Sequence, residues 1–256
     1  MQDSRIESRS NPLIREMRTL GTPKGRRTLG RHLVEGERLV GDALRSGAPV
    51  EMLFYVESFP IDRLSVPASV RRFVVSESVL EAITDSHTPQ GVAASVITPD
   101  TAVPARFPEA LGVVLDGVQD PGNVGTIIRS ADAFGAGFVL LSAACADPFS
   151  PKAVRAAMGS TYHLPIFAGD VPSALDTLVS DGFLPLCGHL NGSETLPALP
   201  EKTVLVIGNE GNGVSDAVAR RCTLYRLPMF GRAESLNASV AAGILLYALR
   251  NAINAK

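Results

Sequence analysis

The stretch LGVVLDGVQDPGNVGTIIRSADAFGAGFVLL, residues 111–141, contains the pattern that decides the fold. Its first apolar run, 111–115, has the length of a buried strand, and a polar, glycine-rich segment follows at 116–125. A helix is predicted from about Thr126 to Phe134, and the apolar run GFVLL predicts the next strand. Strand, loop, helix and strand in this order are typical of a mostly parallel sheet with helices on both faces.

The same alternation continues to the end of the chain. Further strands are predicted at 164–167, 183–188 and 203–208. The chain closes with a long helix over about 236–254, which is apolar nearly all round. Such a helix must be covered on most faces, either inside its domain or at a dimer interface.

The N-terminal part has a different character. The first 30 residues lack a clear periodicity, and TPKGRR at 22–27 has the composition of a loop. From Arg31 the sequence RHLVEGERLVGDALRSG carries a helical stripe of apolar residues that ends near Gly47. Strands are predicted at 52–56, 71–76 and 91–98, and a proline-rich stretch follows. We therefore predict a small N-terminal α/β domain at 1–98, a linker at 99–108 and a larger domain at 109–256.

Composition excludes several classes of protein. The chain has 256 residues, of which 45% are hydrophobic and 20% charged, as in ordinary globular domains. Its apolar runs fall well short of the roughly 18 residues of a membrane span. The three cysteines Cys145, Cys187 and Cys222 are widely spaced and fit neither a disulfide framework nor a zinc site. We therefore expect a protein of the reducing cytoplasm, with no metal and no membrane contact.

Charge is distributed unevenly along the chain. Residues 1–50 hold ten Lys or Arg against six Asp or Glu, whereas the remainder holds 14 against 20. A basic first segment on an otherwise acidic chain indicates contact with a polyanion such as RNA. A solvated arm without a partner is the alternative.

The first of three polar loops follows the strand at 111–115, where open α/β sheets place their ligands. Gly122 and Gly125 permit tight turns, and Asn123 is predicted to cap the helix that follows. Arg129 lies among apolar residues of that helix. It is either functional or held in an ion pair with Asp132 or Asp116, and composition does not separate these.

The second and third loops follow later strands. In GNEGNG, residues 208–213, the glycines are not in the order of a dinucleotide fingerprint, and no phosphate-binding lysine follows. The glycine-rich sequence of this loop is equally consistent with a ligand site and with a plain turn. The segment 227–239 combines LPMFG with SLNAS, and either Ser235 or Asn237 can cap the last helix.

Together, three segments resemble the SpoU (TrmH-like) family of RNA ribose 2'-O-methyltransferases, in the SPOUT superfamily. They are LDGVQDPGNVGTIIRSADAFGA at 115–136, VIGNEGNGVS at 206–215 and LPMFGRAESLNASVAAGILLYA at 227–248. The stretch RHLVEGERLVGDAL at 31–44 is similar to the RNA substrate-binding domain often fused ahead of this catalytic domain. The resemblance implies a trefoil knot where the second and third segments meet, an exception to the rule against threaded chains.

The resemblance also implies a cofactor, S-adenosylmethionine, held mainly by backbone groups. The family's cofactor positions correspond to Gly208, Leu227 and Leu236, with Ile207, Met229 and Gly188 as further walls. Its catalytic positions correspond to Asn123, Arg129, Glu210, Ser235 and Asn237. Because arginine stays protonated in proteins, we expect Arg129 to hold a phosphate and the developing alkoxide instead of acting as a base. Glu210 either orients loops or receives charge.

The resemblance implies a homodimer that methylates a structured RNA, with ribosomal RNA favoured over transfer RNA by the extra N-terminal domain. One rival is an oxidoreductase that binds a nucleotide cofactor on an open α/β sheet, and the glycine order argues against it. Another is a catalytically silent RNA-binding relative, and the presence of Asn123, Arg129, Glu210 and Asn237 argues against it. The four histidines, His32, His87, His163 and His189, are scattered and predicted to be structural or solvent-facing.

Overall fold

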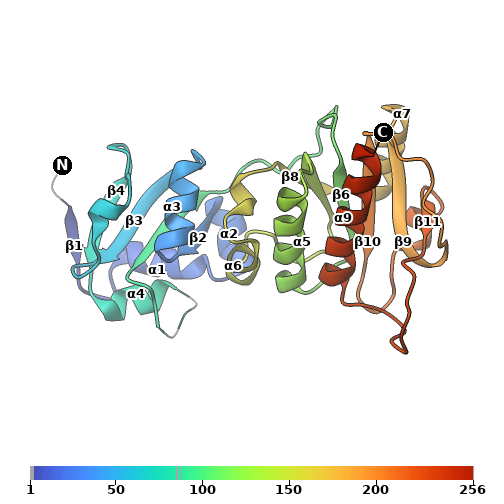
Figure 1. Cartoon of the computed structure of the whole chain (residues 1–256). Coiled ribbons are helices and arrows are strands. Elements are labelled where there is room, and N and C mark those ends of the chain that lie inside the picture. Colours follow the sequence, from blue (N-terminus) through green and yellow to red (C-terminus); the bar gives the residue numbers. More distant parts are fainter. Residues whose placement is uncertain (1–2, 85, 87, 256) are drawn as a thin grey trace. The chain divides into compact units, whose positions relative to one another are not determined.

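The computed structural model describes residues 3–84, 86 and 88–255, so His87 lies outside the described residues. The chain forms two compact units. The first consists of Met1–Pro99 together with Phe149–Tyr162, and the second of Asp100–Pro148 together with His163–Lys256 (Figure 1). Among the described helices, none combines the length and the apolar character needed to cross a membrane.

The first unit is built on a five-stranded sheet in the order β1-β4-β3-β5-β2. Strand β5 runs antiparallel to both of its neighbours, and the other pairings are parallel. The strands are β1 Ser4–Ile6, β2 Arg31–Glu35, β3 Val50–Val56, β4 Arg71–Val75 and β5 Val92–Ile97. The helices are α1 Pro12–Thr19, α2 Pro23–Leu29, α3 Glu37–Arg45, α4 Glu77–Ile83 and α6 Pro151–Ala157, with single 3-10 turns at Ile61–Arg63 and Ser160–Tyr162.

The prediction of an irregular start is wrong, because β1, α1 and α2 together fill most of the first 30 residues. The Asn11 side chain accepts a hydrogen bond from the Leu13 amide, and Thr22 does the same for Gly25. Each cap is followed by a proline at the first helical position, where a missing N–H costs nothing. The mixture of Thr, Pro and Gly at 22–25 is therefore a helix start and not a loop.

The helix predicted from Arg31 is also corrected. Residues 31–35 form β2, and the helix α3 begins only after Gly36. Gly36 has φ 92°, a left-handed conformation that interrupts any helix at this point. Leu33 and Val34 fit the helical stripe of the sequence, but both are buried in the sheet instead.

Phe149–Tyr162 packs with the first unit although it follows strand β7 of the second unit in the chain. The fully buried His32 lies at this contact. Its Nδ1 is 3.1 Å from the hydroxyl of Thr98, its Nε2 is 2.9 Å from the hydroxyl of Tyr162, and its ring lies near Phe149. His32 is therefore structural, as predicted.

The second unit is a six-stranded sheet in the order β11-β9-β10-β6-β7-β8, parallel throughout. The predicted parallel α/β architecture of this unit is confirmed. The strands are β6 Gly112–Asp116, β7 Phe138–Ser142, β8 Ile166–Gly169, β9 Leu184–Ser193, β10 Thr203–Gly208 and β11 Thr223–Tyr225. The helices are α5 Pro121–Ala133, α7 Val171–Ser180, α8 Asp216–Ala219 and α9 Ala238–Asn254.

Helices α5 and α9 lie side by side in the same direction (Figure 1). Asn237 at the start of α9 bonds Asn123 near the start of α5, whereas Tyr247 meets Phe134 at the end of α5 with ring centroids 5.9 Å apart. The parallel arrangement brings both helix N-termini to the same end of the unit. There they adjoin the carboxyl ends of the strands.

Candidate active site

The candidate site lies where the sheet changes its direction of winding. Strands β6 and β10 are neighbours, with Asp116 opposite Gly208 as the last pair of the ladder. From β6 the chain continues outward to β7 and β8, whereas β9 and β11 lie on the far side of β10. Open α/β sheets bind ligands at such a switch point, in the crevice beyond the carboxyl ends of the strands.

The loop after β10 folds back tightly on its own strand. A Cβ at Gly208 would lie 2.2 Å from the backbone carbon of Gly213, so only glycine fits. Asn209 holds the loop in place: its amide donates to the Gly117 carbonyl at 2.8 Å, and its Oδ1 accepts from the Gly211 amide at 2.9 Å. The loop after β10 is thus fastened to the loop after β6.

Glu210 is fastened to the same neighbouring loop. Its Oε1 accepts from the side-chain amide of Asn123 at 2.9 Å, and its two oxygens accept from the backbone amides of Asp120 and Gln119 at 3.3 Å. Partial burial opposes ionisation of this carboxyl, but the hydrogen bonds outweigh it and hold the pKa of Glu210 below its ordinary value. Glu210 is therefore an ionised acceptor that orients the loop after β6.

Asn123 and Asn237 continue this network into the last helix. The Asn237 amide donates to Asn123 Oδ1 at 3.0 Å, while its own Oδ1 accepts from the Ser239 and Val240 amides. Asn237 is thus the N-cap of α9, one of the two caps that the sequence offered. We call the chain of side chains Glu210–Asn123–Asn237 the amide latch. It joins residues 87 and 114 positions apart in sequence.

The predicted cap of α5 is wrong. Asp120 caps this helix, and its side chain accepts from the Asn123 amide at 2.9 Å. Helix α5 accordingly begins at Pro121 and not near Thr126. Asp120 followed by Pro121 is a recognisable start signal, since proline favours the first helical position, and the sequence analysis missed it. Asn123 lies in the first turn of the helix, and its side chain forms the hydrogen bonds of the amide latch instead of a cap.

Arg129 lies on α5, six residues or about 9 Å along the helix axis beyond Asn123. Its side chain is exposed, and among the described residues it makes no hydrogen bond or ion pair. Both acids of the ion-pair alternative are engaged elsewhere. Asp132 bonds His163 at 2.7 Å, and Asp116 accepts from the Ser215 amide at 2.8 Å. Arg129 is not a member of the amide latch.

The predicted cofactor residues fall at the same end of the sheet. Ile207 and Gly208 end β10, and Gly188 lies on the neighbouring strand β9. Leu227, Met229 and Leu236 are each half-buried, whereas Ser235 is exposed and makes no hydrogen bond within the described chain. The structure brings Asn123, Glu210 and Asn237 into contact but gives no direct contact of Ser235 with them.

The segment 227–236 is suited to a ligand held by backbone groups. In the described part of the chain, the backbone amides and carbonyls of this segment pair with no other protein group. Backbone polar groups that are not exposed normally find a partner in the protein, in water or in a ligand. Leu227, Met229 and Leu236 are not exposed, so their backbone groups are available to a ligand such as a bent adenosyl cofactor.

Gly192 marks a close approach that the sequence analysis missed. A Cβ at this position would lie 2.6 Å from the backbone of Tyr225, because β11 pairs with β9 and the register of this pairing shifts between Leu224 and Tyr225. The Arg226 amide donates to the Ser193 carbonyl at 2.8 Å just beyond this shift. No periodicity in the sequence signals such an irregular pairing, since it joins segments that are remote along the chain.

Comparison with known proteins gives matches over both parts of the chain. Residues 110–247 match the SpoU rRNA Methylase family, and residues 11–94 match the MRM3-like substrate binding domain. The Bacillus subtilis 23S rRNA (guanosine(2553)-2'-O)-methyltransferase RlmP is 36% identical over 249 residues, which are 96% of this chain and 98% of the relative. A Streptomyces viridochromogenes 23S rRNA (uridine(2479)-2'-O)-methyltransferase is 31% identical over 276 residues, covering 98% of this chain and 94% of the relative.

A solved structure shows the same similarity in three dimensions. The AdoMet-bound rRNA methyltransferase from Sinorhizobium meliloti superposes with a TM-score of 0.88 at 34% sequence identity, over 98% of both chains.

Proposed function

Because the chain belongs to the SpoU rRNA methylase family, we propose that it transfers a methyl group from S-adenosylmethionine to a ribose 2'-hydroxyl of ribosomal RNA. The observation that carries this proposal is the amide latch, which joins the three segments of the family resemblance at the switch point of the sheet. The AdoMet-bound relative supports the cofactor, and the names of the relatives support an RNA substrate.

The cofactor, when bound, supplies a methyl group on a sulfonium, which is already a good leaving group. Backbone groups of 227–236 and of Gly208 at the end of β10 would hold it, with Leu227, Met229 and Leu236 as apolar walls. Ile207 and Gly188 would close the site from the strand ends. What remains for the protein is to orient the 2'-hydroxyl and stabilise its developing charge.

We assign to Arg129 the stabilisation of the charge that develops on the 2'-oxygen. Its exposed guanidinium has no partner in the described chain, so it is available to an RNA phosphate and to the 2'-oxygen. Because a guanidinium does not give up its proton, it acts as an electrostatic clamp and not as a base, and the proton of the 2'-hydroxyl passes to solvent water. The amide latch fixes the N-terminus of α5, the helix that carries Arg129, against the N-terminus of α9. Ser235, exposed on the segment before α9, is assigned to the same site.

A homodimer belongs to the same proposal. Val240, Ile244 and Tyr247 lie one or two turns apart on α9, and they are 50%, 43% and 60% exposed. This spacing places them on one helix face, and an exposed apolar face is a common site of self-association. A second copy of the chain would cover this face beside α5, the helix that carries Arg129.

We also propose the trefoil knot and a cytoplasmic location. The match of residues 110–247 to the SpoU rRNA Methylase family supports a threaded path through segments 206–215 and 227–237. The three cysteines are unpaired, and burial raises the pKa of the thiols of Cys145, Cys187 and Cys222, as for inert thiols of a reducing compartment.

The test is methyl transfer with a labelled cofactor. The full chain is incubated with labelled S-adenosylmethionine and unmodified ribosomal or transfer RNA, and 2'-O-methyl positions are mapped in the product. Label in ribosomal RNA alone is expected, and label in transfer RNA alone would overturn the substrate assignment. Calorimetry with S-adenosylmethionine and with NAD distinguishes the methyltransferase from the oxidoreductase alternative, because the first should bind S-adenosylmethionine and the second NAD. Cofactor binding without any transfer would favour a catalytically silent relative.

A further inference from the structure

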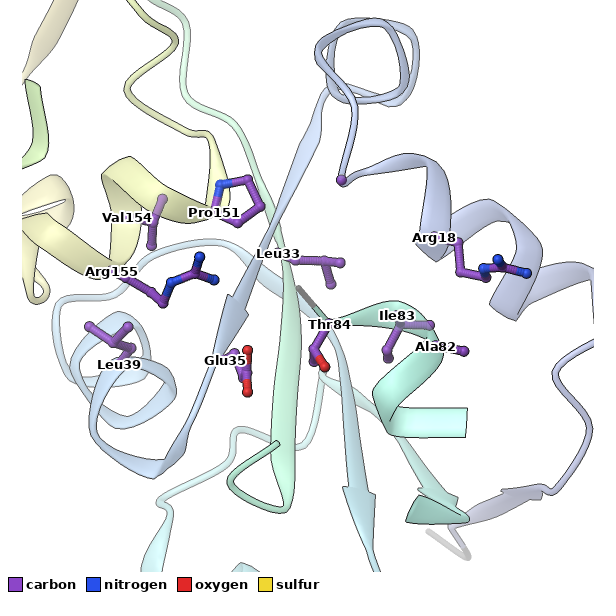
Figure 2. A pocket seen from close by; sticks show the side chains of 11 residues that line it. Arg18, Leu33, Glu35, Leu39, Ala82, Ile83, Thr84, Pro151, Val154 and Arg155 are labelled. Atoms are coloured by element: carbon purple, nitrogen blue, oxygen red, sulfur yellow. The ribbon is translucent and has the colours of Figure 1, made fainter. Parts of the chain in front are cut away.

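The first unit contains a cavity of about 250 Å³ that none of the catalytic segments lines. It is framed by the ends of α1, β2 and α4 and by helix α6 (Figure 2). Its floor is apolar, because Leu33, Ile83 and Val154 line it and are themselves buried. The volume is below the roughly 300–1,000 Å³ of pockets that enclose drug-sized ligands, so the cavity fits a group as small as one nucleobase.

The walls of the cavity add charge to this apolar floor. Glu35 stands at the end of β2, and Arg155 extends from α6 toward the strand that carries Glu35 and Leu33 (Figure 2). Arg18, on the last turn of α1, completes the rim. Unstacked bases in RNA are bound in this way, with their flat faces against apolar side chains or guanidinium planes and their edges hydrogen-bonded to polar groups.

The exposed cations of α1 and α2 differ from most other cations of the unit. Arg5, Arg9, Arg31 and Arg71 each pair with a glutamate, and Arg72 pairs with Asp3. In contrast, four exposed cations of α1 and α2 form no ion pair among the described residues: Arg15, Arg18, Lys24 and Arg27. We call these four the basic helix pair. Cations that the protein leaves unneutralised favour a polyanionic partner.

We propose that this cavity takes the base of one unpaired nucleotide of the substrate RNA, while the basic helix pair binds the phosphates beside it. A free phosphate would use the cations but would leave the floor of Leu33, Ile83 and Val154 uncovered. An apolar ligand would use the floor but not Arg18. One nucleotide within an RNA strand satisfies both. The inference rests on the proposed function for the identity of the RNA, whereas nucleotide binding at the cavity stands on the geometry alone.

The first test detects occupancy of the cavity directly. The full chain, labelled at the methyl groups of Ile, Leu and Val, is titrated with each ribonucleoside 5'-monophosphate and, separately, with inorganic phosphate. At least one nucleotide is expected to shift the signals of Leu33, Ile83 and Val154 saturably, and phosphate is not. Ala82→Trp, which places a large ring at the wall, should abolish these shifts. Ser78→Trp, one turn earlier on α4 and outside the lining, should preserve them.

Two results of this titration would overturn the proposal. One is the absence of a saturable shift at these three methyl groups with any nucleotide. The other is an equal shift with phosphate alone, which would leave no role for a base.

The second test measures the contribution to RNA substrate binding. With unmodified ribosomal RNA, Arg18→Gln and Ala82→Trp are each expected to raise KM for RNA about 5- to 150-fold, the effect of one lost base contact, while kcat and S-adenosylmethionine binding stay unchanged. Arg18→Gln should also reduce the slope of log affinity against log salt by about 0.7–0.9. Arg38→Gln removes another exposed cation without an ion pair, from outside the lining, and should leave KM unchanged.

The outcomes separate the two proposals. If the unaltered protein methylates no RNA, the proposed function fails, and the nucleotide titration still decides the cavity. If it methylates RNA but neither cavity variant changes KM, the cavity assignment is wrong. Equal competition by an acidic peptide such as polyglutamate would identify a protein partner instead and also overturn it.

Discussion

Removal of the Asn123 side chain breaks both links of the amide latch at once. Asn123→Ala leaves the hydrogen bond of its backbone amide to Asp120 in place, so the cap of α5 survives. It removes the 2.9 Å bond to the carboxylate of Glu210 and the 3.0 Å bond from Asn237. A hydrogen bond to a charged group contributes about 1.5–3 kcal/mol and a neutral one about 0.5–1.5 kcal/mol.

The expected loss of stability is smaller than the sum of these values. Glu210 and Asn237 are exposed, so water replaces part of each lost bond, and we expect a loss of about 1–2 kcal/mol in the free energy of unfolding. The effect on catalysis should be larger. The latch fixes two helix N-termini and two loops around the proposed site, and a displacement of about 1 Å there costs about 100-fold in rate. We expect kcat to fall about 100-fold while the protein stays folded.

Urea unfolding and single-turnover methyl transfer to ribosomal RNA measure the two effects separately. Asn212→Ala is the matched control, because this asparagine lies in the same loop, is exposed and bonds through its backbone amide only. It should change neither quantity beyond about 0.5 kcal/mol or a few-fold in rate. A rate within twofold of the unaltered protein for Asn123→Ala, with the expected loss of stability, would refute a positioning role for the latch.

Three further predictions follow from the same geometry. Arg129→Ala should lower kcat at least about 100-fold, as does the loss of one donor to a developing oxyanion, with cofactor affinity and thermal stability unchanged; normal turnover would remove the assigned role. Ile244→Asp should convert a dimer into a monomer in sedimentation velocity, since it places a charge on the exposed apolar face of α9, and an unchanged sedimentation coefficient would contradict the proposed interface. Because the pKa of Glu210 is depressed in the folded state, its contribution to stability is complete above its ordinary value of 4.5 and is lost as pH falls through the lower folded value. Glu210→Gln should therefore reduce the loss of unfolding free energy between neutral and acidic pH, measured by urea titrations at a series of pH values. The reduction should be less than about 1 kcal/mol because this carboxyl is exposed, and an unaltered pH profile would contradict the prediction.

Local sequence determined most of the second unit because its signals are short in range. Buried parallel strands appear as continuous apolar runs, and each run from 111–115 to 203–208 became a strand of the sheet. The end of such a strand followed by Gly, Asn and Asp identified the loops after β6 and β10 as the place for a ligand. The cap of α9 at Asn237 likewise depends on residues within three positions of it.

The errors fall where short segments carry ambiguous patterns. The run from Arg31 to Glu35 fits a helical stripe and a strand equally well, because five residues are too few to separate the two periods. The left-handed Gly36 decided between them. At the N-terminus, Thr22 and Pro23 have the composition of a loop, and only the bond from the Gly25 amide to the Thr22 hydroxyl shows that they start a helix.

The sequence alone therefore determined the strands of the second unit, the three motif segments and the candidate residues, because each of these depends on neighbours within a few positions. Only the tertiary structure decided which of those residues meet. Glu210, Asn123 and Asn237 form one latch because parallel strands β6 and β10 end side by side, although their sequence positions are 87 and 114 apart. The packing of Phe149–Tyr162 onto the first unit, and the cavity that α6 closes there, were decided in the same way. Burial against remote segments fixes such contacts, and no local periodicity carries that information.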